Sequence, residues 1–174
     1  MNKGYVQVYT GNGKGKTTCM LGLTLRAVGA GKSVYIGQFM KYEEYSEIKT
    51  IKQHLPRVTI EQYGAGEGFI QKNNIQNHDI TAARAGYQKA LAALTSEQYD
   101  IVVIDEINVA VYFELLTEDE VLKLIESKPI ETELVLTGRY ATEAIIEKAD
   151  LVTEMKEIKH YYSQNVPARV GIEK

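Results

Sequence analysis

Short apolar runs and longer amphipathic stretches alternate along this chain from residue 5 to residue 154. Runs of about five residues rich in Val, Ile and Tyr are typical of strands, whereas longer stretches with one apolar face are typical of helices. The pattern predicts six strands, at residues 5–9, 33–39, 58–62, 101–105, 133–137 and 151–154. It predicts helices at residues 17–30, 43–55, 79–94 and 117–126, and a short helix capped by Thr142.

This order of elements predicts an α/β fold. Strands that alternate with helices form a mostly parallel sheet flanked by helices, because each parallel connection needs a crossover. Residues 101–104 are Ile-Val-Val-Ile, an apolar run that suits a strand covered on both faces. The chain has no linker, repeat or low-complexity segment, so a single domain over residues 1–174 is expected. Residues 63–77 are rich in Gly and Asn and are predicted to form a long loop of the kind that carries function.

The composition is that of an ordinary globular protein, with 44% hydrophobic and 25% charged residues. The net charge is -3 and the basic residues are dispersed, so binding to nucleic acid is not expected. No apolar stretch approaches the roughly 20 residues that cross a bilayer, and no signal segment precedes the first strand. The single cysteine, Cys19, excludes a disulfide framework within the chain. A cytoplasmic location away from the membrane is expected, with Cys19 as a small buried side chain on the first helix.

Residues 10–18 read Thr-Gly-Asn-Gly-Lys-Gly-Lys-Thr-Thr and lie between a predicted strand and a predicted helix. In that context glycines let backbone N–H groups turn inward onto phosphate, and the helix N-terminus adds its positive dipole end. Lys16 supplies a charge for phosphate oxygens, and the Thr17 hydroxyl can ligate Mg²⁺. The loop is therefore predicted to bind the triphosphate of a nucleotide, as MgATP. In the usual pattern, G-x-x-x-x-G-K-[ST], the first glycine would be residue 10, but here it is Gly11.

Two acids, Asp105 and Glu106, follow the apolar strand at residues 101–104. Ligands bind at the carboxyl ends of strands in open α/β sheets, so one of these carboxylates is expected to hold Mg²⁺, directly or through water. Two arginines are further candidates. Arg26 lies about two and a half turns beyond Lys16 on the first predicted helix, and either reaches the nucleotide or is solvated. Arg139 follows a predicted strand end, where a phosphate contact and simple solvation both stay open.

The chain resembles the corrinoid adenosyltransferases, the ATP:cob(I)alamin adenosyltransferase family, which has a RecA-like P-loop fold. The resemblance runs nearly from end to end, and its landmarks together are far more specific than a phosphate loop alone. These landmarks are Gly11-Asn-Gly-Lys-Gly-Lys-Thr-Thr18, Arg26-Ala27, Gln38-Phe-Met-Lys41, Gly66-Glu-Gly-Phe69, Val103-Ile-Asp-Glu-Ile-Asn108, Leu136-Thr-Gly-Arg139, Ala149-Asp-Leu-Val-Thr-Glu-Met155, Lys159-His160 and Gly171-Ile-Glu173.

The resemblance implies a reaction in which reduced cob(I)alamin attacks the 5′ carbon of ATP. The adenosyl group moves to cobalt and inorganic triphosphate leaves. Family members bind ATP in the reverse sense along the loop, which places Lys16 near the α-phosphate and suits an offset loop that holds triphosphate as the leaving group. Lys16 and Mg²⁺ then stabilise the charge that develops there. ATP and a corrinoid are implied as substrates, and a reductase that supplies Co(I) and a second copy of the chain in a homodimer are implied as partners.

The resemblance also assigns roles by position. Lys16, Thr17 and Glu106 form the expected catalytic group, and Thr17 and Glu106 are the expected ligands of Mg²⁺. Arg26 is expected to contact the ribose, and Phe69 to lie beside the corrin ring. The residues expected to bind the substrates are Gly11, Asn12, Gly13, Lys14, Gly15, Lys16, Thr17, Thr18, Arg26, Phe69 and Arg139.

Two other functions stay open at this stage. One is a P-loop phosphotransferase or NTPase with an unknown acceptor, although the offset of the loop speaks against it. The other is a protein that senses ATP without turning it over. The family often reads Gly-Phe-Thr-Trp where this chain reads Gly68-Phe-Ile-Gln71, so the family's tryptophan is absent here.

Overall fold

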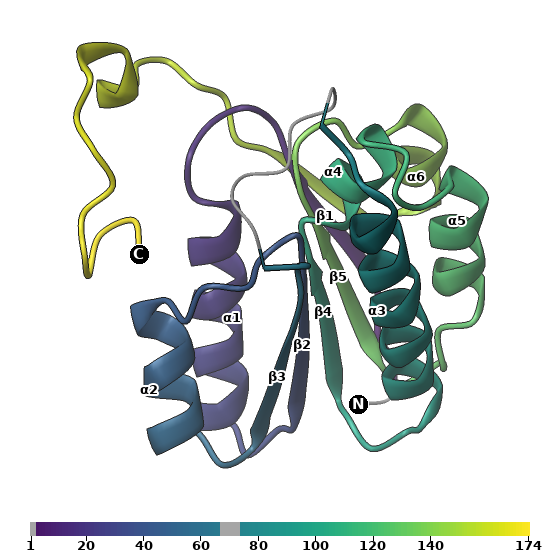
Figure 1. Cartoon of the computed structure of the whole chain (residues 1–174). Helices are drawn as coiled ribbons and strands as arrows, with labels where there is room; N and C mark the ends of the chain where they lie inside the picture. Colours follow the sequence, from purple (N-terminus) through teal and green to yellow (C-terminus); the bar gives the residue numbers. More distant parts are fainter. Residues whose placement is uncertain (1–2, 67–73) are drawn as a thin grey trace.

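The computed structural model describes residues 3–66 and 74–174, which form a parallel β-sheet between two layers of helices (Figure 1). The sheet has six strands in the order β3-β2-β4-β5-β1-β6, and every neighbouring pair is parallel. The α/β fold class and the parallel sheet predicted from the sequence are confirmed. The strands are β1 (Val6–Thr10), β2 (Val34–Phe39), β3 (Val58–Tyr63), β4 (Ile101–Asp105), β5 (Glu133–Thr137) and β6 (Leu151–Glu154).

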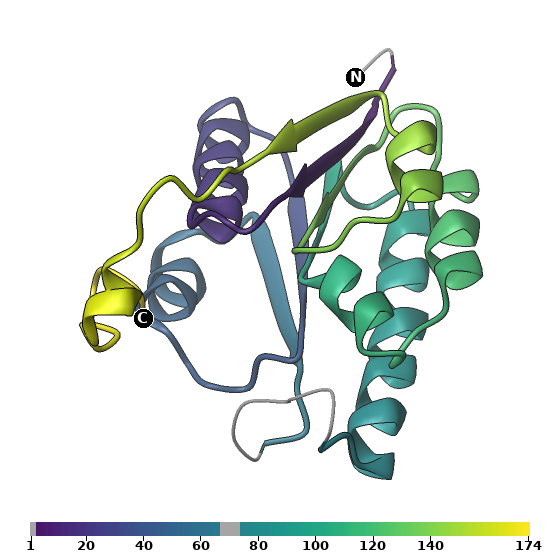
Figure 2. The ribbon, with the colours of Figure 1, turned by 90° about the horizontal axis from the view of Figure 1, so that it is seen from above.

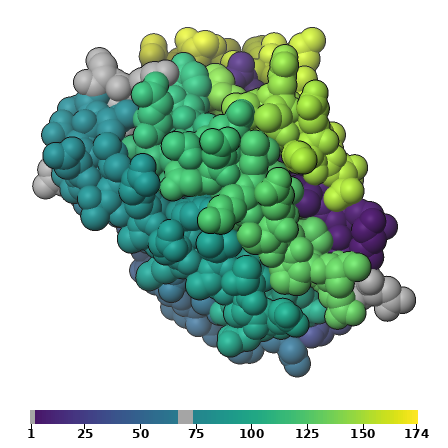
Figure 3. Space-filling view, turned by 90° about the vertical axis from the view of Figure 1, so that its right-hand side faces the viewer, coloured from purple at the N-terminus to yellow at the C-terminus, as the bar shows by residue number. Residues whose placement is uncertain are grey.

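The helices divide between the two faces of the sheet. Two of them cover one face, α1 (Lys16–Gly29) and α2 (Ser46–His54). The opposite face carries α3 (Asn77–Thr95), α4 (Ile107–Tyr112), α5 (Glu118–Glu126) and α6 (Glu143–Lys148). Figure 3 shows this second layer from outside, in teal to green. A 3₁₀ turn, η1 (Tyr161–Gln164), lies in the segment that follows β6.

Alternating side chains of β4 supply both halves of the core. Val102 and Ile104 pack in the cluster beneath α3 and α5, whereas Ile101 and Val103 pack in the cluster beneath α1 and α2. All four are almost fully buried, as expected for a strand covered on both faces. Burying each such side chain contributes roughly 1.5–3 kcal/mol relative to leaving it exposed. The apolar run seen in the sequence therefore anchors the two acids that follow it.

The register of the sheet brings polar residues to one edge. Gln38 of β2 lies beside Asp105 of β4, and Tyr9 of β1 lies beside Thr137 of β5. Because the strands are parallel, their carboxyl ends meet there together with the loop that leaves β1. Figure 2, which looks from above, shows β1 and β6 side by side and the C-terminal segment turning back toward α2.

Several details differ from the sequence prediction. Helix α4 was not predicted, since its short, mostly apolar and β-branched sequence has no helical period. Helix α2 begins at Ser46 instead of residue 43. The prediction for Cys19 is wrong, because Cys19 is exposed; the buried side of α1 carries residues 16, 20, 24 and 27, a spacing that leaves position 19 outside. Part of the predicted loop at residues 63–77 is outside the described residues, but Tyr63 belongs to β3 and α3 begins at Asn77.

Candidate active site

The phosphate loop, residues 11–15, joins β1 to α1 and requires glycine at residues 11, 13 and 15. Gly15 is the N-cap of α1 with φ 124°, a backbone conformation that L side chains rarely adopt. The N–H of Gly13 donates to the carbonyl of Met155 at 2.7 Å, and a Cβ at Gly13 would come within 2.7 Å of the same oxygen. Met155, which directly follows β6, therefore packs against the phosphate loop and stabilises it.

Lys16 is the first residue of α1, and its side chain folds back over the phosphate loop. Its Nζ donates to the carbonyls of Gly11 at 2.7 Å and Gly13 at 2.8 Å, and the residue is only 7% exposed. Burial lowers the pKa of this lysine. An ammonium held at this position, beside the backbone N–H groups of a helix N-terminus, is well placed for phosphate oxygens.

Asp105 is the centre of a buried hydrogen-bond network at the end of β4. It is fully buried and accepts hydrogen bonds from Thr137 Oγ1 at 2.6 Å, Gln38 Nε2 at 3.0 Å and Thr17 Oγ1 at 3.2 Å. Its ion pair is with Lys41, whose Nζ lies 2.7 Å from Oδ2. Burial acts to raise the pKa of Asp105, but the ammonium of Lys41 and these hydrogen bonds outweigh it and lower the pKa.

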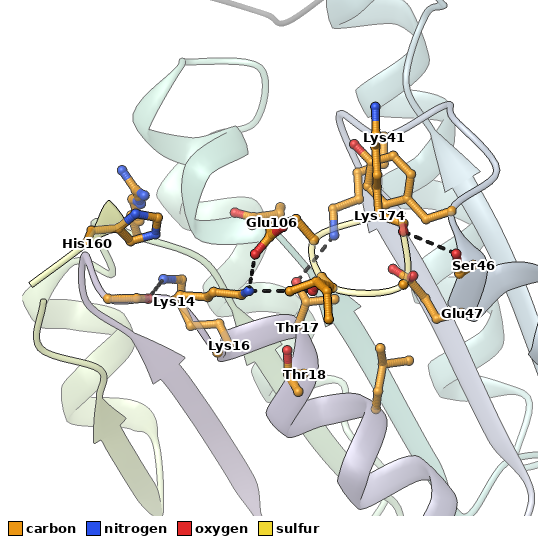
Figure 4. Close-up of a pocket in the computed structure, with 18 residues that line it drawn as sticks. Lys14, Lys16, Thr17, Thr18, Lys41, Ser46, Glu47, Glu106, His160 and Lys174 are labelled. Atoms are coloured by element: carbon orange, nitrogen blue, oxygen red, sulfur yellow. Dashed lines mark hydrogen bonds and ion pairs between the residues drawn. The ribbon is translucent and has the colours of Figure 1, made fainter. Parts of the chain in front are cut away.

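Glu106 follows Asp105 in a left-handed conformation with φ 62°. Its N–H donates to Thr137 Oγ1 at 3.0 Å, so the same hydroxyl holds both acids. Burial and the charge of Asp105 raise the pKa of Glu106. In Figure 4 the side chains of Lys16, Thr17 and Glu106 lie together on one side of the phosphate loop. The hydroxyl of Thr17 donates its hydrogen bond to Asp105 and not to Glu106. Asp105 therefore belongs to the site together with Glu106.

Lys16, Thr17 and Glu106 line a cavity of about 480 Å³, called the nucleotide cavity below. It includes Lys14, Thr18, Glu106 and Arg139 of the expected site. Gly11, Asn12 and Arg26 are not among its lining residues, and Arg26 lies exposed on α1. Phe69 lies outside the described residues. The full lining is Gly13, Lys14, Gly15, Lys16, Thr17, Thr18, Leu21, Lys41, Tyr45, Ser46, Glu47, Glu106, Arg139, His160, Gly171, Ile172, Glu173 and Lys174.

A second cavity of about 550 Å³ adjoins the first and is more aromatic. The two share four lining residues, called the shared wall below: Lys41, Tyr45, Glu106 and Arg139. The rest of the second cavity is mostly apolar and aromatic, with Phe39, Met40, Tyr42, Glu43, Val109, Phe113 and Tyr140. A ligand in one cavity therefore lies next to a ligand in the other.

Residues 160–174, called the C-terminal strap, close one side of the nucleotide cavity. Lys14 Nζ lies 2.7 Å from Glu173 Oε1 and 3.0 Å from the hydroxyl of Tyr161. Hydrogen bonds from Arg169, Lys14 and Tyr161 hold the pKa of Glu173 far below its usual range. At the other end of the cavity Ser46 Oγ donates to the carbonyl of Lys174 at 3.1 Å (Figure 4). The strap thus links the phosphate loop to α2.

The sequence analysis included Gln38, Lys41, Thr137 and parts of the strap among the landmarks of the family resemblance, but it assigned them no role in the site. Lys41, Gln38 and Thr137 lie at or just beyond the carboxyl ends of buried strands, and this position in the sequence was a signal that could have identified them as site residues.

No group of three or more His, Cys, Asp or Glu residues in the described ranges could hold a metal alone. Within residues 3–66 and 74–174, none of the helices has the length and apolarity that crossing a bilayer requires.

Comparison with known proteins shows the family of this chain. Residues 2–173 match the family model described as ATP:corrinoid adenosyltransferase BtuR/CobO/CobP. A corrinoid adenosyltransferase from Sinorhizobium sp is 37% identical over 98% of this chain and 80% of its own length. Proteins of the same name from Pseudomonas aeruginosa and Escherichia coli K12 are 34% and 33% identical, over 98% of this chain and 84% and 86% of theirs. The chain therefore belongs to the ATP:corrinoid adenosyltransferase family.

Proposed function

We propose that this protein transfers the 5′-deoxyadenosyl group of ATP to the reduced cobalt of a corrinoid. Co(I) supplies the electron pair of the new cobalt–carbon bond, the C5′–O bond breaks, and its electrons leave on inorganic triphosphate. Family membership supports this reaction. The observation that carries it is the shared wall, because a phosphate-binding cavity and an aromatic cavity meet there.

The phosphate loop and Lys16 serve the leaving group. Negative charge grows on the triphosphate as the C5′–O bond breaks, and fixed donors aimed at that charge lower the barrier. The ammonium of Lys16 and the N–H groups at the start of α1 are such donors. Because the cobalt is the nucleophile, no side chain has to form a covalent intermediate.

Thr17, Asp105 and Glu106 provide a set of hard oxygen donors that fits Mg²⁺. That ion is usually bound through one or two carboxylates together with substrate phosphates, so a small protein donor set is sufficient. We expect Thr17 and Glu106 to contact it, with Asp105 bonded to Thr17 from behind. When bound, Mg²⁺ neutralises charge on the triphosphate.

The second cavity suits the corrinoid. Its aromatic and apolar walls, which include Phe113 and Tyr140, match the flat, largely apolar face of a large ring. Phe69 is expected to join this side from the loop before α3. Substrate carbon C5′ then has to lie at the shared wall, where Glu106 and Arg139 face both ligands.

The proposal also covers the source of Co(I), the oligomeric state and the location of the protein. A reductase has to supply Co(I), the active form is a homodimer, and the protein works in the cytoplasm. Sedimentation of the purified chain at several concentrations tests the dimer directly.

The reaction is tested by mixing the protein, MgATP and chemically reduced cobalamin under anaerobic conditions. We expect adenosylcobalamin and triphosphate in equal amounts. Formation of ADP instead would favour a phosphotransferase, and ATP binding without any product would favour a sensor. Lys16→Ala should weaken ATP binding at least about tenfold, whereas Phe69→Ala should impair only the reaction with the corrinoid. Equal loss of both in Phe69→Ala would contradict the role of Phe69.

A further inference from the structure

Asp105 carries its charge in full burial, and Lys41 is the cation paired with it. A buried carboxylate needs such a partner, because taking a lone charge out of water is costly. Burial acts to lower the pKa of Lys41, but the charge of Asp105 outweighs it and raises the pKa. The pair therefore holds both groups in their charged forms.

The ammonium of Lys41 also reaches the hydroxyl of Thr17, at 3.3 Å. Thr17 Oγ1 itself lies 3.2 Å from Asp105 Oδ1. Lys41 thus touches the same hydroxyl and carboxylate that adjoin the expected Mg²⁺ position. Mg²⁺ bound to Thr17 Oγ1 at about 2.0–2.1 Å and an ammonium on the same oxygen would be two cations a few ångströms apart, and their repulsion disfavours holding both there.

We propose that Lys41 is an internal counter-ion that Mg²⁺ replaces. On binding of MgATP, the ammonium of Lys41 would leave Asp105 and Thr17 and stay within the shared wall, which Lys41 lines. This inference rests on the proposed function for the identity of the metal. It assigns Lys41 a role that the phosphate loop does not supply.

The backbone confines this movement to the side chain. The N–H of Gly64 donates to the carbonyl of Lys41 at 2.9 Å, and a Cβ at Gly64 would lie 2.7 Å from the same residue's backbone. Met40, just before it, has φ 58°. The four-carbon stem of Lys41 has the torsions to reposition the ammonium, and the residue lines both cavities. Two carboxylates close enough to raise its pKa, Glu106 and Glu47, also line the nucleotide cavity.

The decisive variant is Lys41→Met, studied without nucleotide or corrinoid. Loss of the ammonium leaves Asp105 unpaired, so the melting temperature should fall by about 5–10 °C. Millimolar Mg²⁺ should restore about 5 °C or more of this loss, because the metal takes the place of the lysine. Wild-type protein, whose Asp105 is already paired, should shift by less than about 1 °C. Mn²⁺ binding followed by electron paramagnetic resonance should be at least about tenfold tighter in Lys41→Met.

Two matched variants separate this exchange from a general loss of packing. Lys41→Met combined with Asp105→Asn removes both members of the buried ion pair, so it should fold and its melting temperature should respond to Mg²⁺ much less than that of Lys41→Met alone. Lys52→Met removes an exposed lysine that pairs with Glu44, and should behave as wild type.

Each outcome bears on the proposal. Recovery of folded Lys41→Met only in the presence of Mg²⁺ supports it. Equal Mg²⁺ responses in wild type and Lys41→Met overturn it, as does failure of the double variant to fold, because charge compensation is then not the role of Lys41. Since no corrinoid is present, a protein that passes these tests but releases ADP would retain this inference and lose the proposed function.

Discussion

Replacement of Thr137 by valine tests whether one hydroxyl holds both acids of the site. Thr137 is fully buried; its Oγ1 donates to Asp105 Oδ1 at 2.6 Å and accepts from the N–H of Glu106 at 3.0 Å. Valine keeps the shape of threonine and replaces its hydroxyl by a methyl group. Asp105 then loses one donor and Glu106 loses the acceptor of its backbone N–H.

The expected loss of stability follows from the two hydrogen bonds that Thr137 Oγ1 makes. A hydrogen bond to a charged group contributes about 1.5–3 kcal/mol, and a neutral one about 1 kcal/mol. Asp105 keeps its bonds from Gln38, Thr17 and Lys41, so the lower part of the first range applies. We expect Thr137→Val to lower the free energy of unfolding by about 3 kcal/mol.

Urea denaturation measures this change, and Thr24→Val is the matched control. Thr24 is also buried, but its Oγ1 donates to the helix carbonyl of Met20 at 2.9 Å and touches no charge. Its replacement should cost about 1 kcal/mol or less. The slope of the free energy of unfolding against urea concentration should be the same in both variants. If the two variants lost equal stability, the hydroxyl of Thr137 would not hold the acids as described.

Three further predictions use other parts of the fold. Gly22→Ala should stabilise the protein by about 0.5–1 kcal/mol, because a Cβ at this helical position meets open space. Gly86→Ala should destabilise the protein, because its Cβ would lie 2.4 Å from the ring of Tyr63. Urea midpoints that shift in the same direction in both variants would contradict this reasoning. Glu173 has a lowered pKa, so its contacts should be fully present above the ordinary pKa of about 4.3 and weaken as the pH falls below it. Hydrogen exchange in the C-terminal strap should then rise, and Glu173→Gln should show the same rise at pH 7; unchanged exchange in that variant would refute the link. Lys16→Ala should reduce ATP affinity at least about tenfold by calorimetry, since a buried charge-assisted contact is lost, and wild-type affinity would exclude Lys16 from the site.

The elements that the sequence predicted well are those with a clear local signal. The β-branched run of β4 and the glycines before Lys16 specify a buried strand and a phosphate loop without help from the rest of the chain. Helix α4 has no such signal, because Ile107–Tyr112 is apolar except for Asn108 and its helical form depends on the turn at Glu106.

The network around Asp105 depends on the order of strands in the sheet. Lys41 and Thr137 are 64 and 32 residues away from Asp105 along the chain. They meet because β2 and β5 flank β4, and no local pattern contains that information. The contact of Glu173 with Lys14 spans 159 residues and likewise needs the whole fold.

The shared wall has a thermodynamic consequence for how the two substrates are taken up. Any ligand that reorients Lys41 or Glu106 from one side alters the charges presented to the other side. If ATP tightens corrinoid binding by some factor, the corrinoid must tighten ATP binding by that same factor, because both equilibria close one cycle. Titration of each substrate with and without a non-reacting analogue of the other would measure this factor twice, from opposite directions.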